Sequence, residues 1–285
     1  MNTPHKTLQL LGIIPDLVQM LREKDGIAVY RVCAGGTWYI LKTYANEADR
    51  REIKNYQYLN VLGVQTLDTF GKTEDALLME DVAHSETLRL AEQGDMNDPA
   101  VAARLAAWYK YLHEYGKSFV AAHGQGMYDE TDCITPEAME AVARQTGTQG
   151  NPAWALFANH FDTISRMVQS IERTLTYNDF YYTNMIVARD KSSAFMFDYN
   201  LLGKGYVYAD LRNVTSSLGR DAGEAFLSAY GKFDPVEKAF DAVSSILTTL
   251  HIACQRTAFP AWAQEELEKV KNGTLEQAIR RLIGL

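Results

Sequence analysis

Two β-prone runs near the start of the chain, joined by two glycines, predict an antiparallel hairpin. Residues 27–33 (IAVYRVC) and 37–44 (TWYILKTY) are rich in β-branched and aromatic side chains. Gly35 and Gly36 between them supply the tight turn that such a hairpin needs. The N-terminal part of the chain is therefore expected to contain a small antiparallel sheet.

A helix is predicted directly after this hairpin, over residues 46–62. Apolar side chains recur there at the spacing of one helix face: Ile53, Tyr56, Leu59 and Leu62. Two more short strands are predicted near residues 65–71 and 76–82, with residues 72–75 as the turn between them. The order strand, strand, helix, strand, strand describes a small sheet with one helix packed on it.

From about Glu86 onward the sequence predicts mainly helices. Three of them begin at Pro99, Pro152 and Pro235, since proline is favoured in the first helical turn. We expect these helices to reach about Val120, Arg173 and Arg256, and two more to cover residues 261–271 and 274–282. The sequence thus predicts an α+β chain with a β-rich N-terminal lobe, residues 1–83, and a larger helical lobe, residues 84–285.

A second hairpin, over residues 185–188 and 194–198, interrupts the helical half and carries polar residues. Because a hairpin brings its outer ends together, Asn184 and Asp198 are expected to be neighbours. Carboxylate and amide oxygens are ligands that Mg²⁺ uses, and Asp179 just upstream is a candidate base. The Asp179-to-Asn184 spacing alone would favour an ordinary turn, because Asp and Asn commonly cap turns. Asp198 opposite Asn184 shifts the interpretation to a metal site.

A second candidate pair lies in the N-terminal half. Lys42 falls late in the predicted strand 37–44, and Glu52 falls in the helix that follows. An unpaired ammonium inside a sheet is costly, so a buried Lys42 requires a carboxylate partner. By themselves the two residues could equally be a solvated lysine and a surface glutamate.

Together these residues resemble the protein-kinase-like fold, specifically the aminoglycoside phosphotransferase and choline kinase family, over roughly residues 27–214. The resemblance implies a two-lobed fold and binding of ATP and Mg²⁺. It implies that Lys42 contacts the α- and β-phosphates with Glu52 as its partner. It also implies that Asp179 is the catalytic base and that Asn184 and Asp198 hold the metal.

The resemblance extends to the nucleotide pocket. The run 77–82 (LLMEDV) resembles the hinge, where backbone groups of Glu80 and Val82 would bind adenine and Met79 would wall its pocket. Gly26 would allow a close backbone approach to a phosphate. Asp210 resembles a downstream aspartate that braces the catalytic loop.

The sequence departs from the family pattern in two places. Tyr177-Asn178 stands where the family usually has His-Gly, and Tyr177 is expected to replace that histidine by packing and a hydroxyl bond. The phosphate loop, residues 24–28, has a single glycine instead of a G-x-G-x-x-G motif. In addition, only eleven residues separate Asp198 from Asp210, which leaves no room for the activation segment of a protein kinase. A small-molecule acceptor is therefore favoured.

The residues that would bind the acceptor are less well defined. Three aromatic residues of the catalytic loop, Phe180, Tyr181 and Tyr182, could line its site or simply pack the loop. An acidic loop, residues 127–133 (MYDETDC), could attract an amine or be a solvated turn. Asn200 stands where many relatives carry a carboxylate, which removes one reason to expect a cationic acceptor.

Composition excludes several other classes of protein. A net charge of −8 argues against nucleic-acid binding, which requires a clustered excess of Lys and Arg. There is no run of 18 apolar residues and no visible signal peptide, so no membrane association is expected. The three cysteines are scattered, which suits free thiols and a cytoplasmic protein. Nothing in the sequence fixes an oligomeric state.

Two functions remain open from the sequence. The first is an ATP- and Mg²⁺-dependent small-molecule kinase that phosphorylates a hydroxyl group of an aminoglycoside, a choline-like amine, a sugar or a similar compound. The second is a nucleotide-binding pseudokinase with a regulatory or scaffolding role, suggested by the Tyr177-Asn178 change and the thin phosphate loop. Joint retention of four residues favours the first function: Lys42, Asp179, Asn184 and Asp198.

Overall fold

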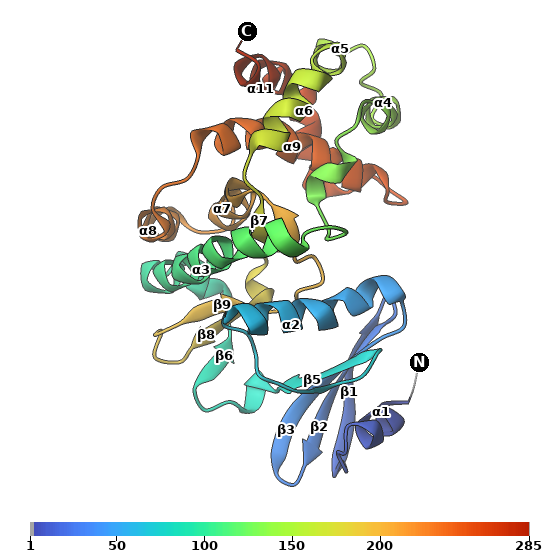
Figure 1. Cartoon of the computed structure of the whole chain (residues 1–285), viewed down its shortest axis with the longest axis vertical. Helices are drawn as coiled ribbons and strands as arrows, with labels where there is room; N and C mark the ends of the chain where they lie inside the picture. The colour runs from blue at the N-terminus through green and yellow to red at the C-terminus, as the bar shows by residue number, and fades with distance from the viewer. Residues whose placement is uncertain (1–2, 285) are drawn as a thin grey trace. The chain divides into compact units, whose positions relative to one another are not determined.

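The predicted hairpin is the centre of a five-stranded antiparallel sheet in the computed structural model, which describes residues 3–284. The strands lie in the order β1-β2-β3-β5-β4 (Figure 1). Their bounds are β1 Leu17–Lys24, β2 Ile27–Ala34, β3 Thr37–Tyr44, β4 Thr69–Lys72 and β5 Ala76–Glu80. The four predicted strands are present, but strand β1 at the edge of the sheet was not predicted.

Alternation along the strands gives this sheet two different faces. In β2, Ala28, Tyr30 and Val32 point to one side, where they form an apolar cluster with side chains of β3 and β5. The short helix α1 (Pro4–Leu10), also not predicted, packs Leu8 into this cluster. The intervening residues of β2, Ile27 and Val29, face a pocket on the other side.

Helix α2 (Arg51–Leu62) lies along that second face (Figure 1). A 3₁₀ turn at Glu47–Arg50 precedes it, and Gly63 ends it with a φ of 70°. Its buried side chains include Ile53, Tyr56 and Leu59, which are three of the four residues that predicted the helix. The helix also buries Glu52, which brings a carboxylate to the sheet.

The second predicted hairpin is present as β8 (Met185–Ala188) and β9 (Ala194–Met196). Met185 lies opposite Met196, and β6 (Leu88–Leu90) adds a third antiparallel strand on the other side of β8. All seven residues of β8 and β9 are buried. This small sheet gives the polar residues at its end a rigid support.

The described residues form two compact units. The first contains residues up to Tyr115 together with Asp179–Leu202 and Asn213–Gly231, so both hairpins and helix α8 (Arg220–Tyr230) belong to it. The second contains Gly116–Asn178, Gly203–Arg212 and the residues from Lys232 onward. The lobe boundary predicted between residues 83 and 84 stays a prediction.

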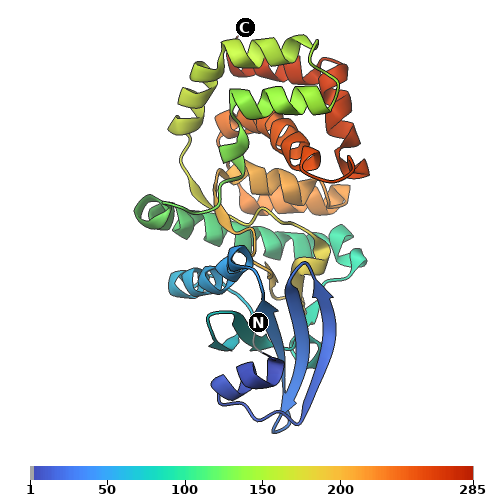
Figure 2. The same ribbon diagram turned by 90° about the vertical axis from the view of Figure 1, so that its right-hand side faces the viewer.

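The second unit is mainly helical and has its own apolar core (Figure 2). Its helices are α4 Pro136–Gln145, α5 Pro152–Asn159, α6 Phe161–Ser170, α9 Pro235–Cys254, α10 Gln264–Lys271 and α11 Thr274–Leu282. It also contains the strand pair β7 (Thr174–Thr176) and β10 (Gly203–Gly205). Helices α3 (Pro99–His123) and α7 (Val207–Thr215) have residues in both units.

The single helix predicted from Pro152 to Arg173 is wrong. The chain turns at His160, which ends α5 and begins α6 with φ −114° and ψ 12°. The turn lets Phe157 and Ile164, on either side of it, both reach the core. Since no glycine or proline stands between Pro152 and Arg173, the break had no strong signal in the sequence.

Two further expectations concern membranes and thiols. Among residues 3–284, the longest apolar helices are too short or too polar to cross a bilayer. All three cysteines, Cys33, Cys133 and Cys254, are free thiols, as expected from their spacing.

Candidate active site

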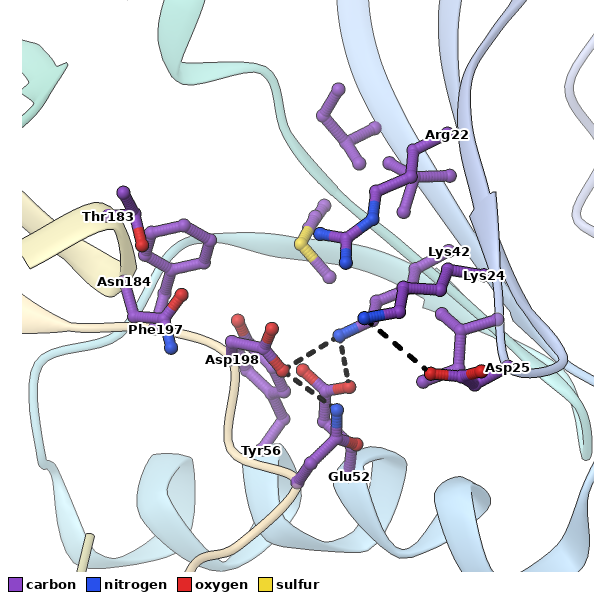
Figure 3. Close-up of a pocket in the computed structure, with 15 residues that line it drawn as sticks. Arg22, Lys24, Asp25, Lys42, Glu52, Tyr56, Thr183, Asn184, Phe197 and Asp198 are labelled. Atoms are coloured by element: carbon purple, nitrogen blue, oxygen red, sulfur yellow. Dashed lines mark hydrogen bonds and ion pairs between the residues drawn. The ribbon is translucent and has the colours of Figure 1, made fainter. Parts of the chain in front are cut away.

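The site is built around Lys42, which extends from β3 towards two carboxylates (Figure 3). Its Nζ atom lies 2.6 Å from Oε2 of Glu52 and 2.9 Å from Oδ1 of Asp198. Glu52 is on helix α2 and Asp198 follows strand β9, so three segments distant in sequence meet at one ammonium group. The Lys42 and Glu52 side chains are only 10% and 1% exposed.

Because Lys42 and Glu52 are buried, the pKa of each depends on the charge of the other. Burial raises the pKa of the Glu52 carboxyl, and the Lys42 ammonium offsets only part of that rise. Burial lowers the pKa of Lys42, but Glu52 and Asp198 outweigh it and raise that pKa overall. Glu52 also accepts hydrogen bonds from the Tyr44 hydroxyl (2.8 Å) and the Tyr199 backbone N–H (3.2 Å). The carboxylate thus has a full set of donors, all fixed in place.

Asp198 is held in an unusual backbone conformation. Its φ is 64°, in the left-handed region that is uncommon for residues other than glycine. The following residue is fixed from both sides, because the Tyr199 carbonyl accepts from Asn55 Nδ2 at 2.8 Å while the Tyr199 N–H donates to Glu52. Such a conformation persists when surrounding contacts over-determine it, and it is typical of functional sites.

The second hairpin brings Asn184 to Asp198, as expected. The N–H of Phe197, the residue before Asp198, donates to the Asn184 backbone carbonyl at 2.9 Å. The side chains of Asn184 and Asp198 both line the pocket (Figure 3). Asn184 Nδ2 donates to Oδ2 of Asp179 at 3.2 Å, which leaves the Asn184 amide oxygen available. Burial and the nearby charge of Asp198 raise the pKa of Asp179, and Lys42 opposes that rise.

These residues surround a pocket of about 430 Å³ within the first unit. Of the residues predicted for the site, Lys42, Glu52, Met79, Asn184 and Asp198 line it, and Asp179 contacts it through Asn184. The other three predicted residues, Gly26, Glu80 and Val82, are not part of the lining.

Gly26 is part of a tight turn next to the pocket, and its contact with a phosphate stays a prediction. Asp25 and Gly26, with φ values of 53° and 84°, connect β1 to β2 in a two-residue hairpin turn. The φ of 84° favours glycine, and a Cβ atom there would lie 2.7 Å from Nδ2 of Asn46, so that side chain would have to move.

Strand β1, which the sequence did not predict, contributes residues to the pocket. Arg22 and Lys24 of β1 both line the pocket and bring two cations to it (Figure 3). Tyr56 and Asn200 also line it. Residues 17–24 (LVQMLREK) show no clear strand pattern, so Arg22 and Lys24 could not be assigned to the pocket from the sequence.

The altered catalytic loop has a physical explanation in the second unit. Asn178, which stands where the family usually has glycine, has a φ of 65°. Asparagine tolerates this left-handed conformation better than most residues. The backbone N–H groups of Tyr177 and Asn178 donate to the two carboxylate oxygens of Asp210, at 2.8 and 3.0 Å. The expected bracing by Asp210 is present, and Tyr177 is fully buried.

This geometry makes a prediction about Asn178. Both Asn178→Gly and Asn178→Ala lose the side-chain bond to the Thr176 carbonyl (3.2 Å), but only alanine is strained at a φ of 65°. We expect Asn178→Ala to be less stable than Asn178→Gly by about 1–2 kcal/mol. Urea denaturation of the two variants measures this difference, and equal stabilities would contradict it.

The three aromatic residues of the loop behave differently from one another. Phe180 is buried, whereas the Tyr181 and Tyr182 side chains are 64% and 36% exposed. Both tyrosines line a second pocket of about 390 Å³, together with Gln93, Met96, Asn97, Ser217, Leu218 and Gly219. Phe180 therefore packs inside the protein, whereas Tyr181 and Tyr182 remain candidates for contact with an acceptor.

The acidic loop is more ordered than a solvated turn. Asp129 is buried, accepts from the Thr131 N–H at 2.9 Å and lies 3.7 Å from Arg173. Burial raises the pKa of Glu130 to about 7. Asp129 thus has a structural role in fixing this loop.

The donor atoms at the pocket fit a hard divalent cation. Asp198 offers a carboxylate and Asn184 an amide oxygen, and both are types of ligand that Mg²⁺ uses. Asn200 Oδ1, on the same pocket, is buried and has no hydrogen-bond partner within residues 3–284. Buried polar atoms are normally paired, so this oxygen is available as a further ligand for a cation or a water molecule. No group of three or more His, Cys, Asp or Glu side chains placed to hold a metal ion occurs among the same residues.

Comparison with known proteins gives matches in structure only. No protein-family model matches the chain, and no curated protein matches its sequence. The choline kinase LicA from Streptococcus pneumoniae is 14% identical, with a TM-score of 0.62 over 95% of this chain and 97% of that one. The macrolide 2'-phosphotransferase MphH from Brachybacterium faecium is 15% identical, with a TM-score of 0.60 over 93% and 96%.

A third solved structure contains ligands. The spectinomycin phosphotransferase APH(9)-Ia, in complex with ADP and spectinomycin, is 14% identical, with a TM-score of 0.59 over 99% of this chain and all of that one. At these identities the likeness establishes the fold and not the activity. The chain has the protein-kinase-like fold of the aminoglycoside phosphotransferase and choline kinase structures, as its sequence predicted.

Proposed function

We propose that the chain is a phosphotransferase that uses ATP and Mg²⁺ to phosphorylate a hydroxyl group of a small molecule. The observation that carries this proposal is the Lys42 ammonium fixed between Glu52 and Asp198, 2.6 and 2.9 Å away, beside Asn184 on one pocket. In this proposal residues 1–83 form the nucleotide-binding lobe and residues 84–285 the catalytic and acceptor-binding lobe.

The charged residues of the pocket have separable roles in this proposal. Lys42 would bind the phosphates as a fixed cation, with Glu52 holding it in position. Asp198 and Asn184 would hold Mg²⁺, which supplies charge neutralisation on the phosphates when bound. Transfer then depends on positioning and electrostatic stabilisation, for which rigid, buried supports such as Glu52 are suited.

Asp179 is the proposed base. One of its oxygens accepts from Asn184, so the other is available to take the proton of an acceptor hydroxyl. Its raised pKa makes it a stronger base than an exposed aspartate, which supports this role. The hydrogen bond from Asn184 Nδ2 to Asp179 also fixes the orientation of the Asn184 amide, whose oxygen is the proposed metal ligand.

Adenine binding is proposed for the end of β5. Met79 lines the pocket there. The Glu80 N–H is already used by the Asp68 carbonyl, so Glu80 could contribute only its carbonyl. The Val82 N–H has no acceptor among residues 3–284 and is available as a donor. Solved spectinomycin phosphotransferase structures of this fold contain bound ADP or AMP, which supports nucleotide binding by this chain.

The acceptor is proposed to be small. Only eleven residues separate Asp198 from Asp210, and helix α7 begins within them at Val207. This leaves no loop long enough to bind a peptide substrate. Candidate acceptors are hydroxylated amines, sugars and antibiotics.

An ATP-consumption assay tests the function. The purified chain is incubated with Mg²⁺-ATP and a panel of aminoglycosides, choline, ethanolamine, amino sugars and hydroxylated amino acids. We expect acceptor-dependent ADP release with at least one compound. ATP binding without turnover across a broad panel would favour the pseudokinase, and absence of ATP binding would exclude both.

The metal assignment has its own test. Asp198→Ala is expected to abolish the Mg²⁺-dependent part of ATP binding, because the variant loses the only carboxylate of the proposed metal site. Calorimetric titrations with ATP, with and without Mg²⁺, measure this. Asp190→Ala, in the turn of the same hairpin, is the matched control and is expected to bind as the wild type does. An Mg²⁺ effect that survives in Asp198→Ala would refute the assignment.

A further inference from the structure

Strand β1 presents two cations to the nucleotide pocket by direct cross-strand pairing. Arg22 lies opposite Val29 and Lys24 lies opposite Ile27. Directly opposed residues of an antiparallel pair project from the same face. Since Val29 and Ile27 line the pocket, Arg22 and Lys24 are brought to it as well (Figure 3).

A β-bulge determines which residues face the pocket. The register of β1 against β2 shifts between Met20 and Arg22, which leaves Leu21 as the extra residue. If the register before the shift continued, Leu21 would oppose Val29 and Glu23 would oppose Ile27. The bulge therefore replaces a leucine and a glutamate by an arginine and a lysine on the pocket face.

Without Arg22 and Lys24 the pocket would have more negative than positive side chains. Its lining contains three cationic side chains, Arg22, Lys24 and Lys42, and three carboxylates, Asp25, Glu52 and Asp198. Two of the carboxylates lie against Lys42 and offset its charge. Lys42 alone therefore leaves little net positive charge for a polyphosphate.

Arg22 and Lys24 are both available for a ligand. The Arg22 guanidinium lines the pocket and makes no hydrogen bond or ion pair with any described residue of the chain. Lys24 has only a 3.8 Å contact with Asp25, and both side chains are largely exposed. An exposed ion pair of this kind contributes little and is easily exchanged for a phosphate.

We propose that Arg22 and Lys24 form a phosphate-binding site on β1 that performs the task of the missing glycine-rich loop. The ligand is the phosphate chain of the nucleoside triphosphate, so the inference rests on the proposed function. Backbone amides of a glycine-rich loop are replaced by two side-chain cations, one of them a guanidinium that can bind phosphate oxygens in a bidentate manner.

Nucleotide titrations with a graded number of phosphates test this site. The wild type, Arg22→Ala, Lys24→Ala and the double variant are titrated calorimetrically with adenosine, AMP, ADP and ATP at fixed Mg²⁺. We expect ATP affinity to fall about tenfold for each substitution, as for loss of a hydrogen bond to a charged group. Adenosine affinity is expected to stay unchanged. Lys72→Ala, a lysine of β4 outside the pocket, is the control and should change neither affinity.

The outcomes separate this inference from the proposed function. If the wild type binds no adenine nucleotide, the proposed function fails. If the wild type binds ATP and the double variant binds it equally well, only the phosphate site is refuted. Equal losses for adenosine and ATP would also refute it, since that pattern indicates damage to the pocket. Inorganic tripolyphosphate should compete with ATP in the wild type and not in the double variant.

Discussion

Asp179→Asn is expected to lower kcat by about 10²–10⁴-fold while ATP still binds, because the substitution removes the proposed base and little else. The asparagine keeps an oxygen that can accept from Asn184 Nδ2, so the loop contact at 3.2 Å is preserved. Asp190→Asn, on the turn of the nearby hairpin, is the control and should leave kcat unchanged. Wild-type turnover in Asp179→Asn would exclude the assignment.

The same substitution is expected to stabilise the protein at neutral pH. Burial raises the folded-state pKa of Asp179 above its ordinary value of 3.8, so its ionised form is disfavoured in the folded chain. A carboxyl shifted in this direction contributes stability below its unfolded pKa and loses it as the pH rises through the folded pKa. The Tm of Asp179→Asn should therefore exceed that of the wild type at pH 7, and the gain should disappear near pH 3. Activity of the wild type should fall as the pH drops through the raised pKa.

The elements that the sequence predicted best are those whose packing imposes a pattern on their residues. Helix α2 and strand β2 each bury one face, so their buried residues repeat at a helical or an alternating period. The hairpin β8–β9 is buried throughout, and its apolar runs are interrupted only by the turn. Burial thus produces a pattern of apolar residues from which the element can be predicted.

Strand β1 has no such pattern of apolar residues. Seven of its eight residues are exposed, so neither alternation nor an apolar run distinguishes it. Its bulge breaks what periodicity remains, because the residues before and after Leu21 follow different phases. The two cations that β1 carries could not be assigned to the pocket without the strand and its register.

The polar site could be predicted in part because its geometry follows from the hairpin. Asn184 and Asp198 are neighbours because their strands pair in register, which the two apolar runs already implied. The backbone conformation of Asp198 could not be predicted in this way, since its φ of 64° depends on contacts from helix α2. Asn178 is the opposite case. In the sequence, asparagine in place of the usual glycine looks like the loss of a family feature, but asparagine is compatible with the φ of 65° that the loop adopts.

The second large effect is expected for Lys42→Met, which should lower the free energy of unfolding by about 3–5 kcal/mol, because it breaks a buried ion pair from one side. Glu52 is completely buried and would keep its charge with only the Tyr44 hydroxyl and the Tyr199 N–H as donors. The loss should be largest near neutral pH and shrink towards pH 4.5, where the pKa of Glu52, already raised by burial, allows the carboxyl to become neutral.

A double-mutant cycle separates the loss of the pair from the loss of a packed side chain. Lys42→Met/Glu52→Gln removes both charges and keeps an oxygen for Tyr44, so it should recover most of the stability lost in Lys42→Met. It should not recover ATP binding, since the phosphate-binding ammonium is absent. Arg220→Met, which removes one partner of an exposed pair with Glu224, is the control and should change stability by less than about 1 kcal/mol. Urea denaturation gives the free energies of unfolding of the wild type, Lys42→Met, Glu52→Gln and the double variant. If the two single substitutions add without coupling, Lys42 and Glu52 do not act as a buried pair, and the support for a fixed ammonium at the nucleotide pocket is lost.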